Sequence, residues 1–386
     1  MRILMLSFYF EPDLSAGSFR ASALLRALSL AAPEGTTIDL LTTQPNRYET
    51  FKLQAPSYEK QGDIIIQRFS LPAHRSGFID QAYAFLVYAW NTLMAVRGKN
   101  YDLVVATSGR LLTATLASLI ARQKKASLYL DIRDIFVDTI SDLMAKPLSV
   151  FLLPLFKQIE KFSISRATKI NLVSGGFLEY FIQRYPKKLF SIIPNGVDDE
   201  FLNVDFSKTT AERKVILYAG NLGKGQGLDR ILPGLAIALM KSCDFVIIGD
   251  GGQKTALAEA VVGITNVTLL PPVSRKKLIE YYRNSDILFL HLNSHSAFQK
   301  VLPSKLFEYA ASGKPILAGV SGYAAEFLRT VPNVAVFPPC DVAAGVNAVH
   351  SLKSELTDRA FFINSYRRST LTKTLADDIL TFGSIS

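Results

Sequence analysis

The feature that most constrains this chain is an alternation of short apolar runs with stretches of helical periodicity. This alternation is typical of βαβ units, which build parallel sheets covered by helices. In the first half, strands are predicted at 3–7, 37–42, 64–69, 103–107, 127–131, 169–173 and 190–193. The pattern starts again after a polar stretch, with strands predicted at 215–219, 245–248, 267–270, 287–290, 315–318 and 335–337.

Two runs of this pattern predict an α/β protein with two doubly wound domains that face each other across a cleft. A chain of 386 residues is long enough for two such cores. We place the domains at 1–200 and 201–360, with the linker starting near 195–198. The stretch from about 360 to 386 is helix-like and is available to pack back on the first domain. Ligands of doubly wound sheets bind beyond the carboxyl ends of the strands, so the site is expected in the cleft.

The net charge of +10 is spread along the chain, with 23 Lys and Arg against 18 Asp and Glu in residues 1–200 and 20 against 15 in the rest. This excess suits phosphate-bearing ligands or an anionic membrane surface. The sequence lacks zinc-finger spacing and RNP-like aromatic runs, so we predict no nucleic-acid partner. Two distant cysteines, and an apolar start without a cleavage site, favour a cytoplasmic protein.

The segment 78–96 is rich in aromatic residues and could be mistaken for a membrane span. Asp80, Gln81 and Asn91 interrupt it, so it does not fit a bilayer-spanning helix. We predict a buried core helix here, in preference to a helix that contacts a membrane surface.

A first candidate site is the loop 13–20, which follows the opening strand. A turn of small residues around Gly17 presents backbone N–H groups to an anion, and Arg20 could add a bidentate phosphate contact. The alternative is an ordinary turn in which Ser18 caps the following helix.

A second candidate is the glycine-rich loop 220–227 after the first strand of the second domain. Its glycines allow close approach of a diphosphate, and Lys224 offers a positive charge. The spacing matches neither a Walker A motif nor a dinucleotide fingerprint. Gly249 follows the next strand at the same sheet edge. The alternative is a flexible turn without a ligand.

The third candidate is the segment 300–315. Ser304 is predicted to cap a helix whose first turn contains Lys305, so its N–H groups and this cation suit a phosphate. Glu308, one turn later, could accept hydrogen bonds from ribose hydroxyls. The alternative is a surface helix with a solvated Glu308. The full set of residues predicted to bind this ligand, with its phosphate and ribose groups, is Gly17, Asn221, Gly223, Lys224, Gly249, Lys300, Pro303, Ser304, Lys305, Leu306 and Glu308.

Metal-binding patterns are missing from the sequence. No D-x-D motif occurs, and His291 and His295 lack the placement of a helical metal site. We therefore predict a metal-independent protein without a cofactor, in which lysines and helix dipoles neutralise a diphosphate.

Six motifs occur here in the order of one known family. They are the Gly17 loop, Asp131-Ile132-Arg133-Asp134, 193–198, 218–228, 249–251 and 303–315. Together the chain resembles the family 4 glycosyltransferases, retaining enzymes of the GT-B fold with two Rossmann-like domains. The closer likeness is to the subgroup that builds bacterial O-antigen and capsule, the aminodeoxysugar transferases.

The resemblance implies a hexosyl- or aminodeoxyhexosyl-transferase that uses a nucleotide sugar, with UDP as the expected nucleotide. It also implies a polyprenyl-diphosphate-linked acceptor and a location at the cytoplasmic face of the inner membrane, with peripheral association. Lys305, Glu308 and Asp131 are the implied catalytic candidates, and Arg20 and Asp134 the acceptor-side ones. No protein nucleophile is required.

The chain departs from the family pattern at two places. Lys300 stands where the family has the first Glu of a Glu-x7-Glu pair, whose second member is Glu308. Asn221 and Gln226 replace an Arg and a Lys of the glycine-rich loop. Our hypothesis is that Lys224, Lys300 and Lys305 compensate. Two alternatives stay open: a nucleotide-sugar 2-epimerase of the same fold, and a non-catalytic subunit that binds nucleotide sugars.

Overall fold

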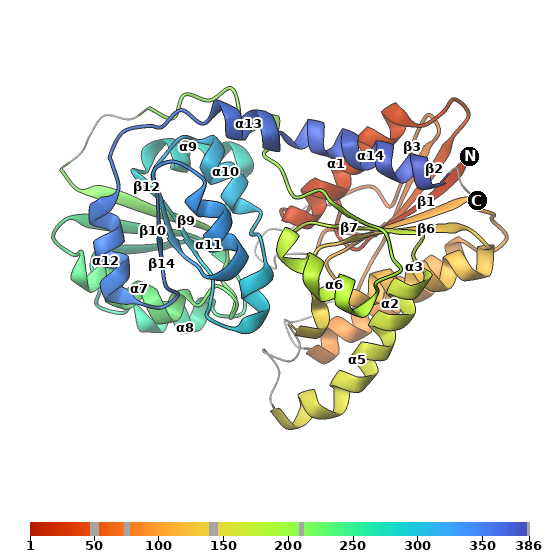
Figure 1. Cartoon of the computed structure of the whole chain (residues 1–386), viewed down its shortest axis with the longest axis horizontal. Helices are drawn as coiled ribbons and strands as arrows, with labels where there is room; N and C mark the ends of the chain where they lie inside the picture. The colour runs from red at the N-terminus through yellow and green to blue at the C-terminus, as the bar shows by residue number, and fades with distance from the viewer. Residues whose placement is uncertain (47–53, 73–77, 139–145, 208–211, 384–386) are drawn as a thin grey trace. The chain divides into compact units, whose positions relative to one another are not determined.

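The computed structural model describes residues 1–46, 54–72, 78–138, 146–207 and 212–383, and the chain forms two compact units (Figure 1). Unit 1 comprises Met1–Pro194 together with Ser369–Ser386, and unit 2 comprises Asn195–Arg368. The chain thus passes between the units after residues 194 and 368, whereas the sequence placed these boundaries at 200 and about 360.

Unit 1 is built on an eight-stranded sheet with the strand order β3-β4-β2-β1-β5-β6-β7-β8. Its strands are β1 (Arg2–Ser7), β2 (Thr37–Thr43), β3 (Tyr58–Gln61), β4 (Ile64–Phe69), β5 (Leu103–Ser108), β6 (Ser127–Ile132), β7 (Lys169–Leu172) and β8 (Phe190–Ile192). All neighbours pair in parallel except β3, which pairs antiparallel with β4. The seven predicted strands are present. The edge strand β3 was not predicted, because its sequence YEKQ contains no apolar run.

Helices cover the sheet of unit 1. They include α1 (Ala16–Ala31), α2 (Phe78–Ala95), α3 (Leu111–Lys124), α5 (Lys146–Arg166), α6 (Leu178–Arg184) and α14 (Arg368–Gly383). The C-terminal α14 completes the core, since Leu375 and Ile379 are fully buried in the same apolar cluster as Ile3 and Met5. Asp378 fixes this helix by accepting hydrogen bonds from the side chains of Tyr129, Lys169 and Ser191.

The helix α2 differs from the prediction of a buried core helix. One face packs against the sheet, with Phe85 and Tyr88 buried. The opposite face carries Tyr83, Leu86, Trp90 and Met94, whose exposed fractions are 58%, 65%, 64% and 44%. The helix is therefore half core and half surface. Within the part of the chain that is described, no helix combines the length and apolarity needed to cross a membrane.

Unit 2 is built on a six-stranded parallel sheet with the order β11-β10-β9-β12-β13-β14. Its strands are β9 (Lys214–Asn221), β10 (Cys243–Asp250), β11 (Val267–Leu270), β12 (Ile287–His291), β13 (Ile316–Gly319) and β14 (Val334–Phe337). All six were predicted. The strand order reverses direction at β9 and β12, and such a switch point leaves a crevice at the carboxyl edge of the sheet.

The helices of unit 2 lie on both faces of its sheet, and each face has its own apolar cluster. They are α7 (Leu228–Ala238), α8 (Lys254–Ala260), α9 (Arg275–Asn284), α10 (Lys305–Ala311), α11 (Gly322–Arg329), α12 (Val342–Ser351) and α13 (Ala360–Tyr366). A short 3₁₀ helix, η3 (Ser296–Lys300), precedes α10.

The two ends of unit 2 are joined to each other. The Val197 N–H donates to the Tyr366 carbonyl at 2.9 Å, and the Arg368 N–H donates to the Val197 carbonyl at 2.8 Å. The Arg368 guanidinium lies 2.5 Å from Asp198. A side chain at Gly196 would place its Cβ 2.6 Å from the Tyr366 carbonyl oxygen, so the approach of the two segments requires glycine there.

Candidate functional site

The two glycine-rich turns of unit 2 lie side by side at the carboxyl edge of the sheet. In the pairing of β9 with β10, Gly220 is opposite Gly249 and Asn221 is opposite Asp250. A Cβ at position 249 would lie 1.9 Å from the Gly220 carbonyl oxygen. The strand ends can come this close only because position 249 has no side chain.

This close approach gives a direct test. Gly249→Ala is expected to push the ends of β9 and β10 apart and to lower the free energy of unfolding by about 1–3 kcal/mol, the usual cost of strain at a crowded backbone position. Gly252→Ala in the same turn is the matched control, since a Cβ there meets nothing within 4 Å. Urea unfolding measures both variants. Equal free energies of unfolding for the two variants would contradict the role of this contact.

The loop 221–227 has its own internal support. The Gln226 Oε1 accepts hydrogen bonds from the Asn221 side chain at 2.9 Å and from the Gly223 N–H at 3.1 Å. The two residues that replace the family's cations, Asn221 and Gln226, are therefore hydrogen-bonded to each other. The Lys224 side chain is exposed, and its carbonyl accepts a hydrogen bond from Asn293 at 3.1 Å.

His291, at the end of β12, holds this loop in place and was not predicted to do so. Its Nδ1 lies 2.5 Å from the Gln226 carbonyl oxygen, and its Nε2 accepts the Cys340 N–H at 3.0 Å. Burial lowers the pKa of His291 to about 4, so the ring is neutral and Nδ1 carries the proton. The sequence signal was only a histidine at a strand end, which does not reveal contacts to two distant loops.

Lys305, the first residue of α10, reaches the end of β9. Its ammonium lies 3.7 Å from the centroid of the Tyr218 ring, and 2.5 Å from where a Cβ of Gly220 would be. The side chain is largely buried, and this burial lowers its pKa to about 7, while the charge of Glu308 acts in the opposite direction. The structure thus brings Lys305 and the glycine-rich turns together.

Glu308 lies one turn further along α10 and is only 13% exposed, so the alternative of a solvated carboxylate is wrong. It accepts a hydrogen bond from the Tyr282 hydroxyl at 3.0 Å and lies 3.6 Å from the Arg275 guanidinium. Burial raises the pKa of Glu308, and Arg275 opposes that rise. Arg275 also pairs with Asp198 at 2.5 Å. Sequence reasoning missed Arg275, because it lies in another helix.

The predicted cap of α10 is wrong. Ser304 has helical dihedral angles (φ −61°, ψ −34°), and its side chain makes no capping hydrogen bond. The N–H groups of Leu306 and Phe307 donate to the carbonyls of Pro303 and Ser304, both at 3.2 Å, in a tight first turn. The Leu306 side chain is fully buried in the core. Attraction of an anion therefore depends on Lys305 more than on a capped helix.

Lys300, the other departure from the family pattern, ends η3 and is partly buried. Its proposed compensation for the lost charges remains a hypothesis.

In unit 1, the predicted roles of Arg20 and Asp131 need correction. Both side chains are fully buried and form a bidentate ion pair at 2.8 and 2.9 Å. Arg20 also donates to the carbonyls of Ile193 and Pro194. Burial alone would raise the pKa of Asp131, but Arg20, Asn171 and Arg133 lower it below its ordinary value. The pair is internal support for the sheet, so neither residue is placed to touch a phosphate or an acceptor.

The loop at Gly17 also differs in detail. Ser15, and not Ser18, caps α1, by accepting the Ser18 N–H at 3.1 Å. The Arg133 guanidinium lies against Gly17, with a nitrogen 2.5 Å from where a Cβ would be. Gly17 thus makes room for a cation at the carboxyl edge of the unit 1 sheet.

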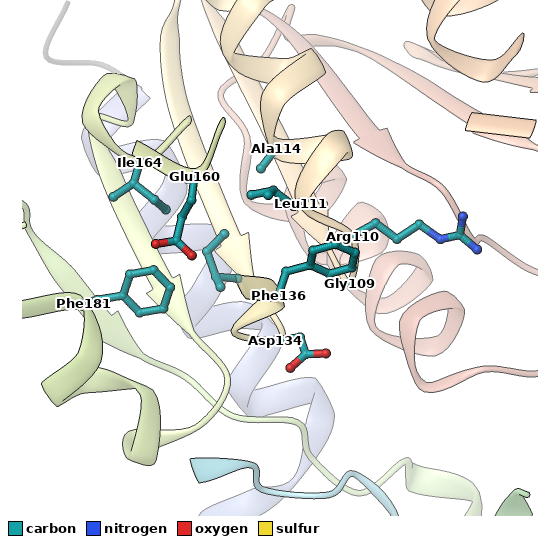
Figure 2. A pocket seen from close by; sticks show the side chains of 10 residues that line it. Gly109, Arg110, Leu111, Ala114, Asp134, Phe136, Glu160, Ile164 and Phe181 are labelled. Atoms are coloured by element: carbon teal, nitrogen blue, oxygen red, sulfur yellow. The ribbon is translucent and has the colours of Figure 1, made fainter. Parts of the chain in front are cut away.

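A small cavity of about 20 Å³ lies beyond the ends of β5 and β6 in unit 1. Its walls include Asp134, Phe136, Glu160 and Phe181 (Figure 2). The buried Glu160 accepts hydrogen bonds from the hydroxyls of Tyr180 and Tyr185, each at 3.1 Å, and burial raises its pKa. Asp134, the other acceptor-side residue of the prediction, is only partly buried and lines this cavity.

Arg110 lines the same cavity, but Figure 2 shows its guanidinium directed away from the other lining side chains. It donates to the Tyr9 hydroxyl at 2.6 Å and lies over the Phe8 ring at 4.2 Å.

Comparisons with known proteins agree with this geometry. Residues 202–368 match the family model described as glycosyl transferases group 1. The chain is 25% identical over 270 residues to WcaI of Escherichia coli (strain K12), which is assigned as a colanic acid biosynthesis glycosyl transferase; the match covers 66% of each protein.

Solved structures show the same fold over almost the whole chain. Sucrose-phosphate synthase from Thermosynechococcus elongatus superposes with a TM-score of 0.67 at 15% identity, covering 99% of this chain and 96% of that one. HepE of Anabaena in complex with UDP-glucose gives 0.61 at 17%, with coverage of 100% and 94%. WaaG, a glycosyltransferase involved in lipopolysaccharide biosynthesis, gives 0.61 at 12%, with coverage of 100% and 95%. The predicted fold class, with two Rossmann-like α/β units, is confirmed.

Proposed function

We propose that the chain transfers a sugar from a UDP-linked donor, with retention, to a lipid-linked glycan during surface polysaccharide synthesis. The match of residues 202–368 to the group 1 glycosyl transferases and the fold shared with solved glycosyltransferases support this proposal. The observation that carries the proposal is the position of Lys305, whose ammonium lies against Gly220, the glycine that pairs with Gly249 where the two glycine-rich turns begin. The relatives named for colanic acid and lipopolysaccharide synthesis support the polysaccharide class of product.

The donor is proposed to bind in unit 2 with its diphosphate at the ends of β9 and β10. Gly220, Gly223 and Gly249 let the backbone approach the phosphates, and Lys305 supplies the positive charge. Glu308 is held by Tyr282 and Arg275, and its free lone pairs would accept hydrogen bonds from the ribose hydroxyls. The complex of HepE with UDP-glucose supports this choice of donor class.

The proposed reaction breaks the bond between the sugar and the diphosphate and forms one to an acceptor hydroxyl on the same face of the sugar, and the proton of that hydroxyl passes to the leaving diphosphate. Charge develops on the leaving diphosphate as this bond breaks. A preorganised cation there stabilises the transition state more than the ground state, and this needs no protein nucleophile. Lys305 is the residue placed for that role. The acceptor is assigned to unit 1, where Asp134 borders a cavity beyond β5 and β6.

Two linked measurements test the proposal. A thermal-shift screen over UDP-, GDP-, ADP- and dTDP-sugars should show one nucleotide class that raises the melting temperature through selective binding to the folded protein. That donor is then incubated with a polyprenyl-diphosphate-linked sugar, in the presence and absence of EDTA. We expect a product that keeps the donor's anomeric configuration, at rates that EDTA does not change.

Other outcomes would replace the proposal. An epimerised nucleotide sugar formed without acceptor would identify a 2-epimerase. Binding without hydrolysis or transfer to any acceptor would identify a non-catalytic binding subunit. Activity that EDTA abolishes and magnesium restores would overturn the expectation of metal independence.

A further inference from the structure

The exposed face of α2 carries a continuous apolar row. Tyr83, Leu86, Trp90 and Met94 follow each other at spacings of three and four, which places them on one side of the helix. All four are among the exposed large apolar side chains of the chain. We call these four residues the α2 stripe. Single exposed apolar residues are ordinary, but a row of four that includes two aromatic rings indicates a binding surface.

Basic residues gather where this stripe ends. Arg97 continues the spacing three residues beyond Met94 and is exposed. A hollow joins Met94 and Arg97 to Lys124 at the end of α3. A second hollow joins Arg122 and Lys125 to Arg166 at the end of α5. We call Arg97, Arg122, Lys124, Lys125 and Arg166 the basic end.

Nearby carboxylates do not cancel this charge. Asp39 is buried and is paired with Lys99 at 3.0 Å and with the Tyr101 hydroxyl at 2.7 Å. Asp102 accepts the backbone N–H of Arg2 at 2.7 Å. Neither carboxylate lines the two hollows at the basic end.

We propose that the α2 stripe and the basic end form one docking surface for an anionic lipid bilayer. Helices that lie in a membrane interface combine one apolar row with flanking Lys and Arg residues, and they bury that row only as deep as the headgroup boundary. Tyr and Trp favour this boundary, because their rings are apolar and their polar tips remain hydrated. The basic end would contact lipid phosphates. A single row of side chains is narrower than a typical interface between proteins.

This proposal rests on the proposed function and extends it, because the surface would bring unit 1 to the membrane that holds a lipid-linked acceptor. Its test requires no catalysis, so it can fail while donor binding and transfer succeed, and the reverse is equally possible.

Trp90 is the only tryptophan of the chain and therefore reports on the stripe directly. Vesicles of phosphatidylethanolamine and phosphatidylglycerol are titrated into the protein, while emission and sedimentation with the vesicles are followed. We expect the Trp90 emission to shift to shorter wavelength, with binding that increases with phosphatidylglycerol content and weakens in salt. Vesicles of phosphatidylcholine alone should bind weakly.

Variants separate the two parts of the surface. Leu86→Gln with Met94→Gln removes apolar contacts, keeps the probe, and should lower partitioning about tenfold or more. Arg122→Gln with Lys125→Gln should lower binding to anionic vesicles only. Leu30→Gln, at a leucine of α1 that is even more exposed than Leu86, is the matched control and should bind like the original protein.

Three results would overturn the proposal. One is failure of the original protein to sediment with anionic vesicles. Another is vesicle binding that leaves the Trp90 emission unchanged. The third is an emission shift that depends on protein concentration without vesicles, which would assign the stripe to contact with a second copy of the chain.

Discussion

Replacing Lys305 by methionine is expected to lower kcat/KM for sugar transfer by about 100- to 1000-fold, the usual effect of removing one preorganised group that stabilises developing negative charge. Methionine has a similar length and can fill the space over the Tyr218 ring. Because burial of the ammonium is unfavourable, the variant should keep or raise the melting temperature. Loss of activity with retained stability is therefore the expected combination.

The lowered pKa of Lys305 should make the affinity for UDP depend on pH. In the free protein this pKa is lowered to about 7, and a bound diphosphate would raise it again. UDP should thus bind with uptake of a proton above pH 7, and its affinity should fall by up to about tenfold per pH unit there. Calorimetry in two buffers of different ionisation enthalpy measures this uptake.

The free energy of unfolding of the free protein should also depend on pH through Lys305. The folded pKa of about 7 lies below the ordinary value of 10.5. Between these values the unfolded chain binds more protons, so stability should rise with pH across this window. The rise should be missing in Lys305→Met.

Two variants control the Lys305 experiment. Lys305→Arg should retain binding above pH 7, because guanidinium stays charged. Lys241→Met makes the same change at an exposed lysine of unit 2 and should leave activity and proton uptake unchanged. If Lys305→Met binds and turns over the donor normally, the central role of this residue is refuted.

The second large effect is expected on stability, from Arg20→Met in unit 1. The change leaves the buried Asp131 carboxylate without its guanidinium and removes the Arg20 hydrogen bonds to the carbonyls of Ile193 and Pro194, of which the Ile193 carbonyl keeps the bond from Asn171. Removing one member of a buried ion pair typically costs about 3–5 kcal/mol. Urea unfolding followed by circular dichroism, with hydrogen exchange in β6 and β7, measures the loss.

A matched control lies in the same helix. Arg26 pairs with Glu11 at 2.6 Å, but both side chains are exposed. Arg26→Met should therefore cost about 1 kcal/mol or less. The double variant Arg20→Met with Asp131→Asn should be more stable than Arg20→Met alone, because no buried charge is left. Equal losses at positions 20 and 26 would show that burial does not set the energy of these pairs.

The Arg20–Asp131 pair also has a defined pH dependence. The pKa of Asp131 is lowered below its ordinary value of 3.8. Its contribution to stability is therefore present above that value and is lost as the pH falls through the lower, folded pKa. The variant that carries Asp131→Asn should show a smaller loss of stability in acid.

The parallel strands could be predicted because each is a buried apolar run, and burial on both faces leaves a strong sequence pattern. The edge strand β3 has no such run, because it pairs on one side only. The burial of α2 was overestimated for a different reason. Its sequence is apolar around most of its circumference, and hydrophobicity alone cannot tell a core face from a face that binds something else.

In the site, contacts between sequence neighbours could be predicted, and contacts between distant segments could not. The spacing of Lys305 and Glu308 in one helix is local, so the sequence could place them near each other, and strand ends bring the glycine-rich turns to the same edge. The partners of Glu308 could not be predicted, since Tyr282 and Arg275 come from another helix. Arg20 was interpreted as a phosphate ligand because its partner lies 111 residues away.

The return of α14 to unit 1 has a consequence for synthesis of the chain. Unit 2 leaves the ribosome before the rest of α14, since its last residue, Arg368, begins that helix. The two ends of unit 2 are joined by the hydrogen bonds between Val197, Tyr366 and Arg368. The cluster around Ile3 and Met5 must wait for Leu375 and Ile379. Although domains generally fold in the order of synthesis, here the later unit can close first. The earlier unit keeps apolar surface open until translation of α14 is complete, which makes it the part of the nascent chain most in need of a chaperone.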